Sequence, residues 1–394
     1  MNSYIYKCFN CGKEFSPAEI EQNFIYLCPD CGSAEKNKPL EGVLTIVYDY
    51  ESIKKKLSPT DFLKLQPGKF WLYPLLWPLD FSGLNRMPVT RLALPADQLF
   101  EYELSGRTVS VQDETRNPTL SYKDRASALV ALKAMELGIK EIAAASTGNA
   151  GSSLAGICAR LGLGSRIYVP ENIPDSKRIQ IEAYGAKLEI VNGDYDAAFD
   201  KCLEDSTIHK WYNRNTAYNP LTIEGKKSAA FDIFISTKGN LPAYIYVPVG
   251  DGVIISGLFK GFKELSLLGW IDNPPKLIAV QSEKSDAVVR FLHSGNFEYK
   301  PATTRADSIS AGAPRNLYMA ADSVKNSGGY GITVSDGEIL SAQKEFIKAT
   351  GILCEPSSAA TYAAFKKNPH DNSLLLITGN GLKDAAALTS NEKE

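Results

Sequence analysis

Short apolar segments alternate with amphipathic ones along most of this chain, and this alternation constrains the fold more than any other feature. Six apolar runs have the length of buried strands: 141–146, 165–169, 187–191, 243–249, 276–281 and 374–378. Stretches with apolar residues at helical spacing lie between them: 152–161, 176–184 and 252–265. Strands and helices that alternate in this way form parallel sheets covered by helices. We therefore predict an α/β protein with doubly wound parallel sheets.

The length of the chain allows two lobes and a small additional module. With 394 residues, the sequence is long enough for two or three hydrophobic cores. Residues 126–235 contain several complete strand–helix units, and we predict that they form a small α/β domain. Residues 43–125 and 236–394 would then form a large α/β domain, and residues 1–42 an N-terminal module. In sheets of this kind, ligands bind outside the carboxyl ends of the strands.

The N-terminal module contains two pairs of cysteines. Cys8 and Cys11 form the first Cys-x-x-Cys pair, and Cys28 and Cys31 form the second. Four thiolates in this arrangement can surround one tetrahedral Zn²⁺, and a module of this size has too small a core to fold without such help. We predict a zinc ribbon with a structural role, because four protein ligands leave no coordination position for a substrate.

The composition argues against several classes of function. A formal net charge of −2 implies no basic surface for nucleic acid. No apolar run approaches the length of a membrane span, and residues 1–15 lack the pattern of a signal peptide. Paired cysteines suit a reducing compartment and a metal better than disulfide bonds. We expect a cytoplasmic protein that acts on a small molecule, not on nucleic acid or a membrane.

A lysine lies at the entrance of a strongly apolar helical segment. Lys123 follows a Pro-containing turn and precedes residues 126–137, which have near-helical apolar spacing. Loops of small residues follow two of the predicted strands, at 145–151 and at 247–252. A reactive amine and two such loops are what a phosphorylated cofactor held as a Schiff base requires. Lys123 is therefore the candidate catalytic residue, and a solvated surface lysine is the alternative.

Glycine turns follow two of the predicted strands. The first turn opens a helix, so its backbone N–H groups and the helix dipole suit a phosphate group. Its residues are Gly250, Asp251, Gly252, Val253 and Ile254. Thr378 begins the second turn, where its hydroxyl can bind a ring nitrogen or simply order the turn. Neither turn is specific alone, because many strand-to-helix turns contain glycines.

Taken together, these motifs resemble those of the threonine synthases. Five of them occur in that family's order and spacing: Ser-Tyr-Lys-Asp-Arg at 121–125, Ser-Thr-Gly-Asn at 146–149, Pro-Val-Gly-Asp-Gly at 248–252, Glu-Pro-Ser-Ser-Ala-Ala at 355–360 and Thr-Gly-Asn-Gly-Leu-Lys-Asp at 378–384. The resemblance covers nearly the whole chain, including the ribbon. It implies a lyase of amino-acid biosynthesis that uses pyridoxal 5′-phosphate (PLP) and has the two lobes of the tryptophan-synthase-β fold, fold type II. It is compatible with a homodimer or a monomer.

The resemblance implies a role for each matching residue. Lys123 would bind the cofactor as an internal aldimine, and Asn149 would hydrogen-bond its phenolic oxygen. The turn 250–254 would hold the cofactor phosphate through backbone N–H groups, and Thr378 would meet the pyridine nitrogen. A neutral hydroxyl there leaves the nitrogen largely unprotonated, which suits elimination and replacement better than transamination.

The sequence departs from the family on the substrate side. Ser146 and Thr147 would receive the substrate α-carboxylate. The family segment Asn-Ser-Val-Asn-Pro-x-Arg-x-Glu-Gly grips the substrate phosphate, but here Ala217 and Thr222 stand in place of its serine and arginine. The turn 250–254 lacks the asparagines that are common in the family, and Leu120 replaces a usual glycine. Loss of a bidentate arginine weakens a phosphate site unless another cation replaces it. The candidate replacements are Lys177, Arg178, Arg305 and Arg315.

Three functions therefore remain as hypotheses. The first is a threonine synthase that converts O-phospho-L-homoserine and water to L-threonine and phosphate. The second is an enzyme of β-elimination or β-replacement on another amino acid, such as a serine or threonine dehydratase or an O-phosphoserine-using cysteate or cysteine synthase. The third is a non-catalytic binding module that keeps the PLP fold.

Overall fold

The computed structural model describes residues 4–84, 89–146, 148–171, 175–193 and 195–385, and their strands form three sheets. The strands are β1 (Tyr4–Cys8), β2 (Glu14–Phe15), β3 (Leu44–Tyr48), β4 (Leu99–Leu104), β5 (Arg107–Asp113), β6 (Glu141–Ala145), β7 (Gly164–Pro170), β8 (Lys187–Val191), β9 (Tyr212–Asn213), β10 (Tyr244–Pro248), β11 (Lys276–Ser282), β12 (Tyr330–Val334) and β13 (Ser373–Ile377). The strand orders are β2-β1-β3, β12-β11-β10-β13-β5-β4 and β8-β7-β6-β9.

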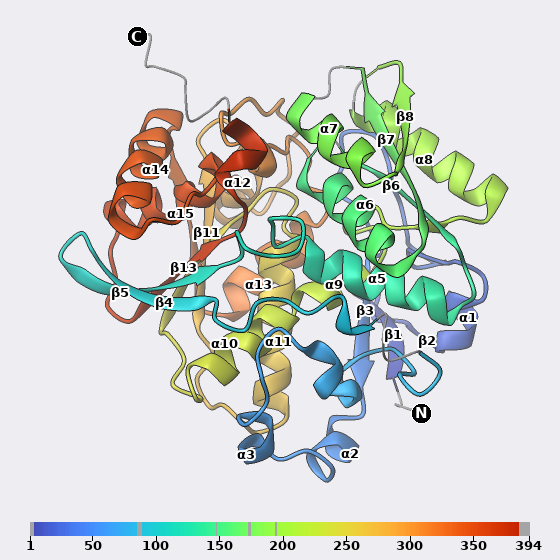
Figure 1. The fold of residues 1–394 in the computed structure, drawn as a ribbon, viewed down its shortest axis with the longest axis horizontal. Coiled ribbons are helices and arrows are strands. Elements are labelled where there is room, and N and C mark those ends of the chain that lie inside the picture. Colours follow the sequence, from blue (N-terminus) through green and yellow to red (C-terminus); the bar gives the residue numbers. More distant parts are fainter. Residues whose placement is uncertain (1–3, 85–88, 147, 172–174, 194, 386–394) are drawn as a thin grey trace.

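Helices connect the strands, and several of them cover the two larger sheets. They are α1 (Pro17–Glu21), α2 (Tyr50–Lys54), α3 (Pro59–Phe62), α5 (Asp124–Glu136), α6 (Asn149–Leu161), α7 (Asp175–Ala183), α8 (Tyr195–His209), α9 (Leu221–Lys226), α10 (Ser228–Ser236), α11 (Val253–Leu267), α12 (Ala287–Ser294), α13 (Leu317–Asn326), α14 (Asp336–Thr350) and α15 (Pro356–Lys367), with the 3₁₀ turns η1 (Phe70–Leu72), η2 (Pro74–Leu76), η3 (Asp307–Ile309) and η4 (Gly381–Asp384). Figure 1 shows the sheet of β6–β8 at the upper right and the sheet of β5, β11 and β13 at the left, with α5 and α9 between them. None of the helices in the described part of the chain is long and apolar enough to span a bilayer.

The predicted α/β fold is confirmed. Each of the six predicted strand segments forms a strand, as β6, β7, β8, β10, β11 and β13, and these strands pair in parallel within their sheets. The predicted helical segments become α5, α6, α7 and α11, with ends shifted by up to three residues. The antiparallel hairpin of β4 and β5 was not predicted. Its turn contains Ser105 and Gly106, both at positive φ, and serine at such a position is a weak sequence signal.

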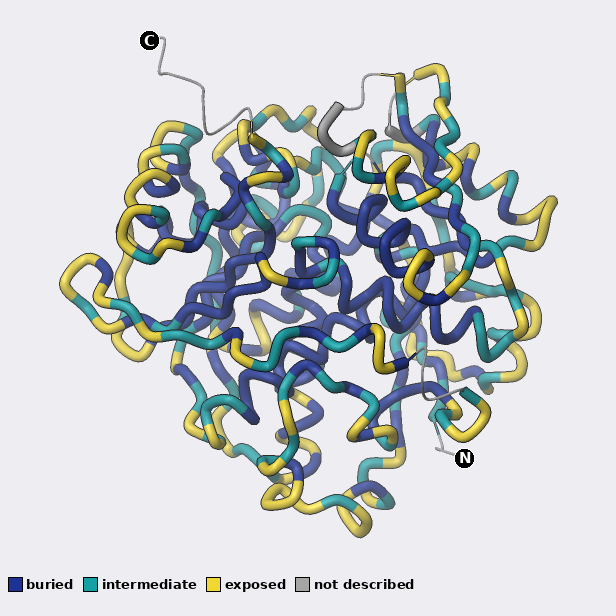
Figure 2. The backbone as a smooth tube through the Cα atoms, in the orientation of Figure 1, coloured by how far each residue is buried: buried dark blue, intermediate teal, exposed yellow. Residues whose placement is uncertain are grey.

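Helix α5 is buried on all sides, and this burial brings charged groups into the core. Every residue from Asp124 to Ala134 is buried, and Figure 2 shows the dark buried backbone running through the middle of the molecule. Such a helix must satisfy its polar side chains internally. Lys133, near its C-terminal end, forms an ion pair with Glu21 of α1 at 3.1 Å.

The N-terminal module is attached to this central helix. Tyr4 and Tyr6 donate hydrogen bonds to Glu21 Oε1 at 2.7 and 2.8 Å, and Glu21 Oε2 accepts from Lys133. Strand β3, which lies beyond the predicted module boundary at residue 42, pairs with β1 from Tyr4↔Tyr48 to Cys8↔Leu44. The division into domains stays a prediction.

Candidate active site

A cavity of about 440 Å³ lies beside the segments that follow β6, β10 and β13. Its wall contains the predicted residues Lys123, Ser146, Asn149, Gly250, Asp251, Gly252, Val253, Ile254 and Thr378. Thr147 lies outside the described residues. The structure thus brings together all the described residues that were predicted to bind the cofactor or the substrate carboxylate, and the volume is typical of a small-molecule site.

The segment before Lys123 is fixed by the turn after β13. Tyr122 N donates to Thr378 O at 2.8 Å, and Asn380 N donates to Leu120 O at 3.1 Å. Leu120 has φ +67°, a left-handed conformation that glycine adopts readily and leucine does not. This conformation gives the physical reason why glycine is usual in the family at this position. The segment stores backbone strain directly before the candidate catalytic lysine.

The surroundings of Lys123 favour the neutral form of its amine. Its half-buried side chain lies in the cavity wall, and its Nζ forms no hydrogen bond or ion pair with any described residue. Burial lowers the pKa of Lys123 from its usual value. The Glu355 carboxylate opposes this effect, and the Arg214 guanidinium adds to it. A neutral amine is the form that attacks a carbonyl group or accepts a proton.

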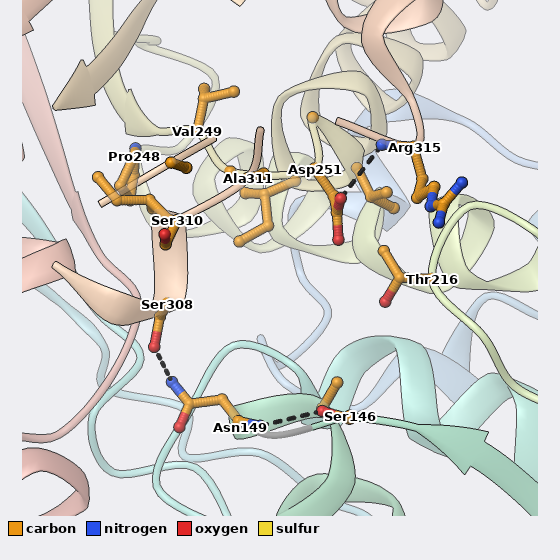
Figure 3. Close-up of a pocket in the computed structure, with 18 of the residues that line it drawn as sticks. Ser146, Asn149, Thr216, Pro248, Val249, Asp251, Ser308, Ser310, Ala311 and Arg315 are labelled. Atoms are coloured by element: carbon orange, nitrogen blue, oxygen red, sulfur yellow. Dashed lines mark hydrogen bonds between the residues drawn. The ribbon is translucent and has the colours of Figure 1, made fainter. Parts of the chain in front are cut away.

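Ser146 and Asn149 lie at the N-terminus of α6. Ser146 Oγ accepts from the backbone N–H groups of Gly148 and Gly151, at 3.2 and 2.9 Å, so its own hydrogen stays available to a ligand. Asn149 Nδ2 donates to both oxygens of Glu355, at 3.1 and 3.0 Å. Asn149 Nδ2 also donates to Ser308 at 3.1 Å, a contact that Figure 3 shows. Asn149 Oδ1 is buried and has no partner among the described residues.

The turn 250–254 is fixed at the N-terminus of α11. Gly252 has φ +85°, and a Cβ there would lie 2.6 Å from Cβ of Ala320, so glycine is required for both reasons. Asp251 Oδ1 accepts from the backbone N–H of Arg315 at 3.1 Å, which fastens the turn to the start of α13 (Figure 3). The first N–H groups of a helix have no partner within the helix and carry its positive dipole, so this turn is suited to a phosphate group.

Thr378 is held at the end of β13 by a neighbouring serine. Ser358 Oγ accepts from the backbone N–H groups of Thr378 and Gly379, at 3.0 and 2.9 Å. The Thr378 and Ser358 hydroxyls are 3.2 Å apart. The Thr378 side chain therefore has a fixed position in the cavity wall.

The four cysteines of the N-terminal module gather at one point. Their Sγ atoms all lie within 4.8 Å of one another. Cys8 and Cys31 are 3.4 Å apart, and Cys11 and Cys28 are 3.7 Å apart. Tetrahedral Zn–S bonds of about 2.3 Å place sulfur atoms about 3.8 Å apart, so the cluster has the size of a Cys₄ zinc site.

The same module reaches the cavity. Asn37 lines the cavity, and Arg315 Nη1 donates to the carbonyl groups of Glu35 and Lys38, both at 3.1 Å. Of the four basic residues proposed as replacements for the missing arginine, Arg315 lines the cavity, and the side chain of Lys177 lies outside the described part of the structure.

Sequence reasoning missed several residues of the wall. Among them are Asn37, Thr216, Lys226 and Ser308. Glu355, which contacts Asn149, was part of a quoted motif but had no predicted role. Lys226 directly follows the substrate segment whose departures were noted, four residues after Thr222. Its basic side chain, close to the missing arginine in the sequence, could have indicated a replacement cation.

The comparisons with known proteins agree with this geometry. The family described as pyridoxal-phosphate-dependent enzyme matches residues 88–379. The chain belongs to this family. It is 34% identical over 400 residues to the threonine synthase of Methanocaldococcus jannaschii, covering 98% of this chain and 95% of that relative. It is 33% identical to the threonine synthase of Methanosarcina acetivorans, covering 97% of this chain and 92% of that relative. The predicted resemblance is confirmed.

Solved structures show the same fold. A threonine deaminase superposes with a TM-score of 0.62 at 23% identity, over 75% of this chain and 93% of that one. O-ureido-L-serine synthase superposes with a TM-score of 0.65 at 16% identity, over 79% of this chain and 97% of that one. At these identities the likeness supports the fold alone.

Proposed function

We propose that this chain is a threonine synthase, which converts O-phospho-L-homoserine and water to L-threonine and phosphate. One observation carries the proposal: an unpaired lysine faces a cavity of suitable size in a chain that matches two threonine synthases over nearly its whole length. The threonine synthase hypothesis therefore takes precedence over the other two.

The cavity residues fit PLP. Lys123 Nζ has no partner among the described residues, the Asn149 amide lies in the same cavity wall, and no side chain caps the first backbone N–H groups of α11. We assign the aldehyde to Lys123, the phosphate to the turn 250–254 and the ring nitrogen to Thr378. Asn149 would donate a hydrogen bond from Nδ2 to the phenolic oxygen of the ring. For this, its amide must rotate away from Glu355 and toward the cofactor. When bound, the cofactor supplies an electron sink for negative charge that develops on the substrate carbons.

The protein side chains supply binding and proton transfer. Lys123 Nζ takes the α-proton, because burial keeps part of the lysine population neutral. The Ser146 hydroxyl donates to the substrate α-carboxylate, since its oxygen already accepts from two backbone N–H groups. Thr147 retains the predicted role in carboxylate binding.

The N-terminal cluster is proposed as the site of a structural Zn²⁺. Its ligands would be Cys8, Cys11, Cys28 and Cys31, whose sulfur–sulfur distances match tetrahedral coordination. A cytoplasmic location and a homodimeric or monomeric state stay predictions from the sequence.

An assay with O-phospho-L-homoserine tests the function. The purified protein, supplied with PLP, is expected to show a visible absorption band and to release phosphate and L-threonine in equal amounts. Borohydride should fix the band to Lys123, and Lys123→Ala should abolish both band and turnover. Lys140→Ala, at an exposed lysine outside the cavity, should keep both.

The same assay separates the alternatives. Thr222 and Ala217, in place of the family's arginine and serine, favour β-elimination or β-replacement on another amino acid as the second candidate. Ketoacid formation from serine or threonine, without threonine formation from O-phospho-L-homoserine, would refute the threonine synthase proposal. A protein that shows no band and no turnover would be the non-catalytic module.

A further inference from the structure

A second lysine in the cavity wall has no role in the assignment above. Lys226, the last residue of α9, is 1% exposed, and its side chain lines the cavity. Its Nζ donates to the backbone carbonyl of Thr222 at 3.1 Å and pairs with no carboxylate in the described part of the structure. A lysine amine has more than one N–H donor, so this group retains unused hydrogen-bonding capacity beside an open cavity.

The Lys226 amine lies close to the place of the arginine that the family has at position 222. Thr222 and Lys226 are four residues apart on one helix, so their side chains lie on the same face. The bond from Lys226 Nζ to the Thr222 carbonyl brings the ammonium back to the turn of the helix where the family has its arginine. A lysine at 226 can therefore deliver positive charge close to the place where an arginine at 222 would.

Two further contacts place Lys226 next to the proposed cofactor site. Tyr122, the neighbour of Lys123, donates from its hydroxyl to the Lys226 carbonyl at 2.8 Å. On the other side, a Cβ on Gly257 of α11 would lie 2.6 Å from Cβ of Lys226, so α9 packs closely against α11. Helix α11 is the one that opens at the turn 250–254.

The electrostatics of this region favour the binding of an anion. Burial lowers the pKa of Lys226 well below its usual value, and the charges of Arg214 and Lys123 lower it further. The Asp251 carboxylate acts in the opposite direction. Buried cations are unfavourable unless an anion pairs with them. The hydroxyl of Thr216, which accepts from Arg214 Nη1 at 3.1 Å, adds a polar group to the same wall.

We propose that Lys226 binds the phosphate group of the substrate and replaces the arginine that the family has at position 222. Thr216 supplies the hydroxyl that the family takes from the serine at position 217. The site is thereby selective for amino acids that carry a phosphate ester, a substrate class that rests on the proposed function. Lys226 acts on the substrate and not on the cofactor phosphate, which belongs to the turn 250–254.

Four holoenzymes test this role: the wild type, Lys226→Met, Lys226→Arg and the control Lys140→Met, at an exposed lysine outside the cavity. Inorganic phosphate is titrated against each by calorimetry, the PLP dissociation constant is measured separately, and KM and kcat are determined with O-phospho-L-homoserine. Lys226→Met should weaken phosphate binding and raise KM, each by roughly 10- to 100-fold, the loss expected for one charged hydrogen bond. Its affinity for PLP should not change. Lys226→Arg should restore most of the phosphate affinity, and Lys140→Met should behave as the wild type.

Two results would overturn the proposal. One is unchanged phosphate affinity in folded Lys226→Met holoenzyme. The other is a loss of PLP affinity as large as the loss of phosphate affinity, which would make Lys226 a cofactor ligand. If the wild type forms no threonine, the proposed function fails, but the phosphate titration still decides whether Lys226 is an anion site.

Discussion

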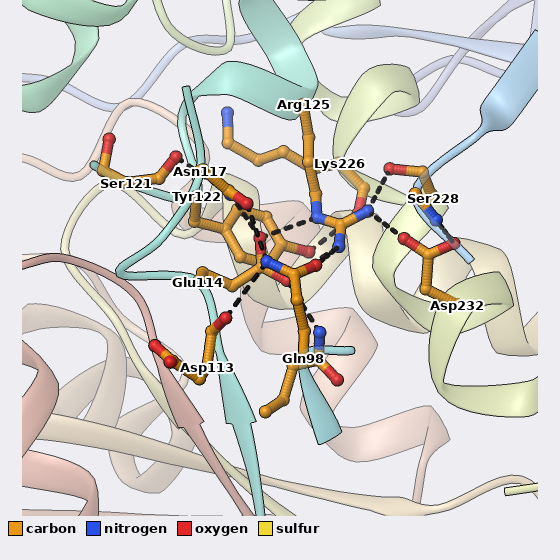
Figure 4. A network of polar contacts seen from close by, with 12 residues as sticks. Gln98, Asp113, Glu114, Asn117, Ser121, Tyr122, Arg125, Lys226, Ser228 and Asp232 are labelled. Atoms are coloured by element: carbon orange, nitrogen blue, oxygen red, sulfur yellow. Dashed lines mark hydrogen bonds and ion pairs between the residues drawn. The ribbon is translucent and has the colours of Figure 1, made fainter. Parts of the chain in front are cut away.

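Replacing Arg125 by methionine would show how strongly the core holds the segment that carries Lys123. The Arg125 side chain is fully buried and makes bidentate contact with Glu114, from Nε at 2.9 Å and from Nη2 at 2.7 Å. Its Nη1 donates to Asp232 of α10 at 2.6 Å. Figure 4 shows this guanidinium between the two carboxylates. Arg125 therefore links the end of β5 with α5 and α10.

The same network reaches the residues just before Lys123. Glu114 Oε2 accepts from Asn117 Nδ2 at 2.6 Å, and this amide also donates to the carbonyl of Ser121 at 3.1 Å. Ser121 is two residues from Lys123. A change at Arg125 is thus transmitted through Glu114 and Asn117 to the backbone of the catalytic segment.

The magnitude follows from the two carboxylates that the change leaves behind. Removing one partner of a buried ion pair costs about 3–5 kcal/mol, because an uncompensated charge stays buried. Two features keep the cost of Arg125→Met within this range. Glu114 retains hydrogen bonds from Gln112 and Asn117, at 3.0 and 2.6 Å. Burial already raises the pKa of Asp232, so this group can take up a proton. Arg125→Met should therefore remove a large share of the about 5–15 kcal/mol typical of a folded protein.

Urea unfolding, followed by circular dichroism, measures the effect. The matched control is Arg107→Met, which breaks an exposed ion pair with Asp371 and should cost less than about 1 kcal/mol. Arg125→Lys keeps the charge but loses the bidentate geometry, so it should lie between the wild type and Arg125→Met. A free energy of unfolding for Arg125→Met within about 1 kcal/mol of the wild type would refute the reasoning.

Three further outcomes are expected. Gly252→Ala should weaken PLP binding and destabilise the protein by more than the about 1–2 kcal/mol cost of left-handed backbone, because its Cβ also overlaps Ala320. Gly162→Ala, at φ +72° in open space, measures that backbone cost alone in urea unfolding, and equal losses of stability in the two variants would contradict the prediction. The affinity of the holoenzyme for phosphate should fall as pH rises through the lowered pKa of Lys226, because the bound form needs the charged amine. Phosphate titrations at several pH values should show no such alkaline loss in Lys226→Arg, because arginine keeps its charge. A zinc chelator should release zinc, detected with a colorimetric dye, and lower the melting temperature, whereas an unchanged melting temperature would argue against a structural metal.

The central parallel strands β6, β10, β11 and β13 could be predicted because they are largely buried on both faces and therefore read as continuous apolar runs. Strand β13, with the sequence Ser-Leu-Leu-Leu-Ile, is an example in which every residue is buried. The edge strand β4 alternates exposed and half-buried residues and includes Glu101 and Glu103, so it has no such run. Lys123 could be predicted because it directly precedes an apolar helical segment. The turn 250–254 could be predicted because it follows an apolar strand and opens a helix.

The rest of the site depends on tertiary packing that leaves no local pattern. Lys226 enters the cavity because α9 packs against both α5 and α11, helices from distant parts of the chain. Glu355 meets Asn149 only because the loop before α15 folds against the start of α6. Asn37 comes from the N-terminal module, where nothing in the sequence indicates contact with a cavity built from much later parts of the chain.

The attachment of Arg315 to the N-terminal module has a practical consequence for expression of shortened versions of this protein. A fragment cut to the matched family segment, residues 88–379, would discard Asn37 and both carbonyl acceptors of the Arg315 side chain. The guanidinium would lose these two contacts directly beside the backbone N–H that donates to Asp251. Measurements on such a fragment would describe a pocket that lacks part of its wall and part of the support of Arg315.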